Sequence, residues 1–209
     1  MTKKSLLNWL CLSGILSIIF YLLHDVVGAM NYPGYNWMSQ AVSDLTATNA
    51  PSYMIATGYI TAYKILNLMC VGLVSILMET DKNKMLKIGI YIFTLMSFIS
   101  AIGYTLFPLS SSGYDGSVQS FIHVYILTAL VVILSIVSLT MIAIGSLRGN
   151  DKHKVLGILA IVSLAIMFIG AIGGNIAPKE VFGIFERFST YSAVVYAGVL
   201  GIVGFKVED

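Results

Sequence analysis

Six long apolar runs constrain the fold of this chain more than any other feature. A helix needs about 20 mainly apolar residues to cross about 30 Å of hydrocarbon. Runs of this length lie at about 7–29, 56–78, 86–107, 119–145, 154–175 and 187–205. Of the 209 residues, 57% are hydrophobic and only 11% are charged, whereas about a quarter of a soluble domain is charged. The sequence therefore predicts an all-α, six-helix transmembrane bundle that forms one domain over residues 1–209.

The start of the chain also fits a membrane span. Lys3 and Lys4 precede the first apolar run, as in a secretory signal peptide. That run is long, however, and it lacks a clear small-residue cleavage site. We expect it to remain as the first span.

The basic residues predict the orientation. Nine of the twelve lie on one side of a six-span arrangement: Lys3, Lys4, Lys82, Lys84, Lys87, Arg148, Lys152, Lys154 and Lys206. Segments 30–55 and 108–118 contain no lysine or arginine. Because basic loops stay in the cytoplasm, we expect both termini to be cytoplasmic. We also expect the chain to be a multi-pass protein of the cell membrane. The net charge of +2 does not suggest a nucleic-acid partner.

Small residues recur at helical spacing in the last two runs. Ala193, Ala197 and Gly201 are spaced four apart, and so are Gly170 and Gly174. Such series let helix backbones approach closely, so we expect them to pack helix against helix within one bundle. The sequence leaves the oligomeric state open.

Polar and aromatic residues gather where the first run ends. His24 and Asp25 interrupt that run, and the aromatic Tyr35 and the polar pair Ser43-Asp44 follow. At about 1.5 Å per residue, His24 lies about 8 Å and His123 about 6 Å below the outer ends of their spans. We therefore expect this outer segment to fold over one mouth of the bundle and help to line a polar site.

Lys64 is the deepest charged residue, about 12 Å into the second run at 1.5 Å per residue. A lysine at that depth costs several kcal/mol unless it is paired, neutral or reaches water. The candidate partners are carboxylates, namely Asp25, Asp44 and Glu186. Snorkelling of its alkyl chain toward the outer face is the alternative.

Each of these residues also has a purely structural interpretation. Histidines within spans often form helix-to-helix hydrogen bonds, and Ser43-Asp44 suits a helix cap or a turn. Glu186 and Arg187 could serve as interfacial anchors. The functional interpretation rests on the convergence of these residues at one membrane face.

Several of these residues also resemble a known family. They are His24, Tyr32-Pro33-Gly34-Tyr35, Ser43-Asp44-Leu45, Phe107-Pro108 and His123. Together they resemble the prokaryotic six-helix membrane proteins called domain of unknown function 998, which look distantly similar to eukaryotic DRAM and Sfk-type proteins linked to lipid homeostasis. The resemblance implies a membrane role without an established reaction, and it points to His24, Ser43, Asp44 and His123.

Three functions remain open. The first is binding of a membrane lipid headgroup or small amphiphile in an outward-facing polar pocket by His24, Asp25, Tyr35, Ser43, Asp44, Lys64, His123 and Arg187. The second is a membrane-embedded hydrolase, in which His24, His123 and Asp44 would hold zinc and Asp44 or Glu186 would be the catalytic carboxylate. The third is a proton-coupled transporter or sensor. We predict no cofactor, with zinc as the alternative.

Overall fold

A computed structural model describes residues 4–148 and 153–207, which form helices and loops without a strand. Six helical spans are long and apolar enough to cross a membrane. The first contains α1 (Leu6–Cys11) and α2 (Ser13–Met30), and the second contains α3 (Tyr53–Leu77) followed by η2 (Met78–Thr80). The third is α4 (Lys84–Leu106), and the fourth contains α5 (Val118–Phe121), η3 (Ile122–Leu127) and α6 (Thr128–Arg148). The fifth is α7 (Lys154–Ile176), and the sixth contains η5 (Lys179–Val181) and α8 (Phe182–Lys206).

The predicted all-α, six-span fold class is confirmed, with some shifts in the span boundaries. The last span differs most, because it begins at Lys179 rather than near residue 187. Charged residues at its start, Lys179, Glu180, Glu186 and Arg187, lower the local hydropathy. The sequence criterion therefore placed the boundary too late.

The spans are arranged as a ring of neighbours. Helix α2 packs on α3 and on α8. From α3, the ring of neighbouring helices runs through α4, α6 and α7 to α8. The contact between α3 and α4 is much less extensive than the contact between α3 and α2. The α3/α4 seam is therefore a looser contact than the α2/α3 seam on the other side of the same helix.

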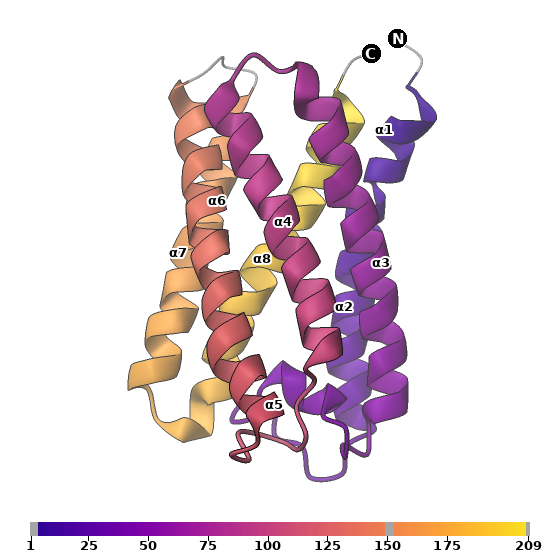
Figure 1. Cartoon of the computed structure of the whole chain (residues 1–209), viewed down its shortest axis with the longest axis vertical. Coiled ribbons are helices and arrows are strands. Elements are labelled where there is room, and N and C mark those ends of the chain that lie inside the picture. Colours follow the sequence, from indigo (N-terminus) through magenta and orange to yellow (C-terminus); the bar gives the residue numbers. More distant parts are fainter. Residues whose placement is uncertain (1–3, 149–152, 208–209) are drawn as a thin grey trace.

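The first and last residues that the structure describes, Lys4 and Val207, contact each other at one end of the bundle, where α1 begins and α8 ends (Figure 1). We call this the terminal end, and we call the opposite end, which carries segments 31–52 and 107–117, the loop end. That the terminal end is cytoplasmic remains a prediction from the distribution of lysine and arginine.

The main apolar core lies between the helices. It includes Cys70, Phe93, Leu139, Tyr196 and Leu200. A smaller apolar cluster at the loop end joins Tyr21 of α2 and Val194 of α8 to the loop residues Val42 and Leu45. The loop end is thus packed as part of the protein interior.

Glycines allow the closest helix contacts. A Cβ atom at Gly201 would lie 2.4 Å from the carbonyl oxygen of Cys11, and one at Gly170 would lie 2.5 Å from that of Phe185. A Cβ at Gly174 would meet Phe182 only at 3.7 Å, whereas one at Gly173 would lie 2.1 Å from the Phe185 ring. The seam of the fifth span is therefore formed by Gly170 and Gly173, rather than by Gly170 and Gly174.

Gly201→Ala should destabilise the bundle, because the added methyl group would clash with the backbone of the first span. Overpacking of this kind costs about 1–3 kcal/mol. Gly72→Ala is the matched control, since a Cβ at that helical position would meet nothing within 4 Å. Thermal unfolding in detergent should show a lower Tm for Gly201→Ala and an unchanged or higher Tm for Gly72→Ala. Equal effects of the two substitutions would contradict the assigned contact.

Candidate functional site

The candidate site lies at the loop end, where segment 31–52 folds across the bundle (Figure 1). Within this segment, η1 (Val42–Thr46) packs against α2, α3 and α8. Leu45 is fully buried in these contacts. The segment therefore closes this end of the bundle, as the sequence predicted.

A buried ion pair joins the first and last spans. Arg187 on α8 donates to Asp25 on α2 through Nε to Oδ2 at 2.8 Å and Nη2 to Oδ1 at 2.7 Å. The Tyr191 hydroxyl donates to the same carboxylate. Both charged residues are only 7% exposed. Two-point pairing between guanidinium and carboxylate is among the strongest protein hydrogen-bond arrangements, so these two predicted ligand-binding residues bind each other.

The same arginine holds the outer loop in place. Its Nη1 donates to the carbonyl oxygens of Trp37 at 2.8 Å and Gln40 at 3.1 Å, and Nη2 donates to the Tyr35 hydroxyl at 2.8 Å. Tyr35 in turn donates to the carbonyl of Ala41 at 2.8 Å. Burial raises the pKa of Tyr35 above its ordinary value, although the nearby guanidinium opposes this effect. The hydroxyl therefore keeps the proton that it donates.

Gly183 makes this docking sterically possible. A Cβ atom there would lie 2.3 Å from the carbonyl oxygen of Gln40 and 2.4 Å from that of Trp37. Gly183 precedes Arg187 by four residues, so the two positions lie on one face of α8. Together they form the surface on which the outer loop rests.

The two remaining carboxylates accept hydrogen bonds from loop backbone. Asp44, which is 4% exposed, accepts from the amide of Gly113 at 2.9 Å. Glu186 accepts from the amide of Val42 at 3.2 Å. Ser43 lies beside Asp44 inside η1, and its carbonyl accepts from the Thr46 hydroxyl at 3.1 Å. These contacts agree with the structural interpretation of Ser43-Asp44 as part of a turn.

Both histidines are buried and contact backbone carbonyls. His24 is 2% exposed and His123 is 8% exposed. Nδ1 of His24 lies 3.2 Å from the carbonyl oxygen of Ala56, and Nδ1 of His123 lies 2.7 Å from that of Phe107. Each imidazole thus joins its own span to a neighbouring one.

A π-helical turn, Ile122–Leu127, positions His123. The Thr128 hydroxyl donates to the carbonyl of His123 at 3.0 Å, and it lies 3.1 Å from the Tyr104 hydroxyl. The Tyr104 ring lies 4.6 Å from the His123 ring. Turns of this type are rare and often occur at functional sites, so His123 and its neighbours remain candidate functional residues.

The two histidines do not belong to a group of potential metal ligands. Over residues 4–148 and 153–207, no three His, Cys, Asp or Glu side chains are grouped closely enough to hold a metal ion. The described side chains therefore do not form the ligand set that the zinc hypothesis assigned to His24, His123 and Asp44.

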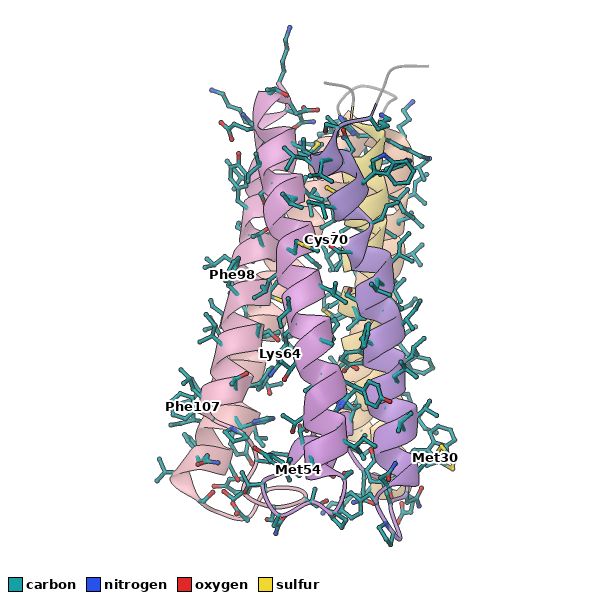
Figure 2. The ribbon with its side chains drawn as sticks, turned by 90° about the vertical axis from the view of Figure 1, so that its right-hand side faces the viewer. Met30, Met54, Lys64, Cys70, Phe98 and Phe107 are labelled. Carbon is teal, nitrogen blue, oxygen red and sulfur yellow. The ribbon has the colours of Figure 1, made fainter. Side chains whose placement is uncertain are left out.

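Lys64 lies on the side of α3 that faces α4. Its ammonium donates to the Thr105 hydroxyl at 2.8 Å, and Thr105 donates to the carbonyl of Ala101 at 2.7 Å. Figure 2 shows Lys64 between Cys70 and Met54 along α3. Because α4 ends at Leu106, the alkyl chain runs toward the loop end, as the snorkelling alternative predicted.

The sequence analysis missed Tyr191, Gly183, Tyr104 and Thr105. The first two follow and precede Arg187 by four residues, so helical spacing from that arginine could have indicated both. Tyr104 and Thr105 could not have been found this way, because their roles depend on the packing of α4 against η3 and α3.

One comparison with known proteins decides the family. A family model described as "Protein of unknown function (DUF998)" matches residues 15–203. The chain belongs to this family. This confirms the resemblance that the sequence motifs suggested, whereas comparisons with curated proteins and with solved structures found no match. Since the DUF998 description gives no activity, the function has to be argued from the geometry.

Asp25→Asn should be strongly destabilising, because it leaves the buried Arg187 cation without its counter-charge. Removing one partner of a buried pair costs about 3–5 kcal/mol. Glu180→Gln is the control, since Glu180 is an exposed carboxylate at the same end of the bundle. Unfolding in mixed detergent micelles with increasing dodecyl sulfate measures both. The double variant Asp25→Leu/Arg187→Met should recover much of the loss, and an Asp25→Asn effect as small as that of Glu180→Gln would contradict the assignment.

Proposed function

We propose that this DUF998 protein binds the anionic headgroup of a membrane amphiphile at Lys64. The ligand would enter from the lipid through the seam between α3 and α4, near the loop end. In the orientation predicted from the basic residues, this seam opens on the outer leaflet of the cell membrane.

The charge of Lys64 is the observation that carries this proposal. Its side chain starts about 17 Å from the beginning of α3, at 1.5 Å per residue, and its ammonium donates to the neutral Thr105 hydroxyl. In the part of the chain that the structure describes, Lys64 forms no ion pair. The ammonium reaches the last turn of α4 without a counter-charge there, so an anionic group beside it would be stabilised.

The three carboxylates considered as partners of Lys64 have other contacts. Asp25 is paired with Arg187. Asp44 and Glu186 accept hydrogen bonds from loop amides. The polar groups beneath the outer loop therefore hold the loop in place, and the attraction for a ligand is concentrated at the α3/α4 seam.

The surroundings of Lys64 favour an amphiphile over a free anion. Ile65, the next residue on α3, is 64% exposed, and Ile102 on α4 is 53% exposed. These side chains belong to the lipid-facing surface of the bundle. A headgroup at the ammonium would thus be continuous with an acyl chain that lies against apolar side chains.

The geometry supports binding better than hydrolysis. A zinc hydrolase needs three protein ligands and an open position for water, and no such group is present among the described side chains. His24 and His123 already contact carbonyl groups. In our proposal they support the shape of the site, while Lys64 provides the charge.

Lys64→Gln should weaken the binding of an anionic lipid. A hydrogen bond to a charged group contributes about 1.5–3 kcal/mol, so the loss should be about tenfold or more. The measurement is native mass spectrometry of the full chain in detergent, titrated with phosphatidylglycerol and, separately, with phosphatidylcholine of the same acyl chains. We expect phosphatidylglycerol binding to fall and phosphatidylcholine binding to stay the same.

Lys179→Gln is the matched control, because Lys179 is an exposed lysine at the same end of the bundle. It removes the same charge from the protein without touching the seam. If Lys179→Gln and Lys64→Gln reduced phosphatidylglycerol binding equally, the effect would be one of net charge and the proposed site would be wrong.

A further inference from the structure

A second polar feature lies on the α3/α4 seam, at the terminal end. It is a shallow groove on the surface lined by Ser75, Ile76, Glu79 and Tyr91. Ser75 is eleven residues from Lys64, which corresponds to about 17 Å along α3. The groove is thus separate from the site proposed above.

An acidic side chain is held in position at the mouth of this groove. The Tyr91 hydroxyl donates to Oε2 of Glu79. Lys87 donates to the backbone carbonyl of Glu79 at 2.8 Å, and its ammonium lies 3.9 Å from Oε1 of the same residue. The Glu79 side chain is nevertheless 67% exposed. The Lys87 side chain is 21% exposed, so a largely exposed carboxylate lies beside a partly covered ammonium.

The groove becomes apolar toward the middle of the bundle. Ile76 is 64% exposed, Tyr91 is 37% exposed and Leu95 is 52% exposed. Beneath them, the hydroxyls of Ser75 and Thr94 lie 2.8 Å apart and join the two helices across the seam. A lipid-facing apolar surface thus begins directly below a pair of opposite charges.

We infer that this groove binds a phospholipid whose headgroup contains a primary ammonium, as in phosphatidylethanolamine. The headgroup ammonium would donate to the Glu79 carboxylate, and the lipid phosphate would accept from Lys87. An acyl chain would lie along Tyr91 and Leu95. The opposite charges of the zwitterionic headgroup match the charges of the protein pair.

Headgroup chemistry separates this ligand from other lipids. A quaternary ammonium, as in phosphatidylcholine, has no N–H group to donate to Glu79. A headgroup without a cation would bring a phosphate close to the Glu79 carboxylate and add repulsion. Lys82 and Lys84 lie near this end, so a general attraction for anionic lipids is the competing explanation.

The test is native mass spectrometry of the full chain in detergent with three lipids of identical acyl chains: phosphatidylethanolamine, phosphatidylcholine and phosphatidylglycerol. We expect the Lys64→Gln variant, which lacks the charge of the site proposed above, to bind phosphatidylethanolamine in preference to the other two lipids. Glu79→Gln should reduce phosphatidylethanolamine binding by about fivefold, which is the upper range for an exposed ion pair. It should leave phosphatidylcholine binding unchanged. Tyr91→Phe should reduce phosphatidylethanolamine binding less, because the carboxylate remains but loses the group that orients it.

Glu180 is an exposed carboxylate at the loop end, so Glu180→Gln should leave the binding of all three lipids unchanged. Lys64→Gln should leave phosphatidylethanolamine binding intact. The two proposed sites can therefore fail independently. In the Lys64→Gln variant, equal binding of all three lipids, a preference for phosphatidylglycerol, or no effect of an added Glu79→Gln substitution would each overturn the inference. Thermal unfolding of the variants confirms that any loss occurs in folded protein.

Discussion

The ion pair between Arg187 and Asp25 is the interaction on which the loop end depends. It joins the first and last spans, and the same guanidinium binds two loop carbonyls and the Tyr35 hydroxyl. A buried arginine is costly unless every donor is used, and here the carboxylate and the loop backbone share that task. One guanidinium therefore links the pairing of the first and last spans to the docking of the outer loop.

This arrangement determines where a ligand can act. The polar side chains beneath the loop form a network that is occupied by internal contacts, and Gly183 lets α8 approach the loop backbone closely. A polar pocket roofed by the aromatic loop was the simplest expectation from the sequence. Within the described residues, the structure instead leaves the Lys64 ammonium with a hydroxyl partner at the α3/α4 seam, where the helix contact is less extensive than that between α2 and α3.

The sequence predicted the spans well because burial in lipid imposes one requirement on every residue of a run, namely apolar character over the membrane thickness. It did not predict the break at Leu12 between α1 and α2 or the π-helical turn at His123. Both depend on contacts between helices rather than on the composition of one helix. The late boundary of the sixth span has the same cause, since Arg187 becomes acceptable in a span only through Asp25, which lies 162 residues away in the chain.

The sequence could predict which residues of the candidate site are exceptional, but not which charged residues pair with each other. Hydropathy shows that His24, Asp25, Lys64 and Arg187 are exceptional in their runs, yet it cannot show which charges neutralise each other. Asp25 could have paired with Lys64 as readily as with Arg187 on sequence grounds. Once the structure assigns Asp25 to Arg187, Lys64 is left with a hydroxyl partner, and that assignment turns a general expectation of a polar mouth into a specific charge at the α3/α4 seam. The ligand chemistry proposed for the seam follows from this distribution of counter-charges.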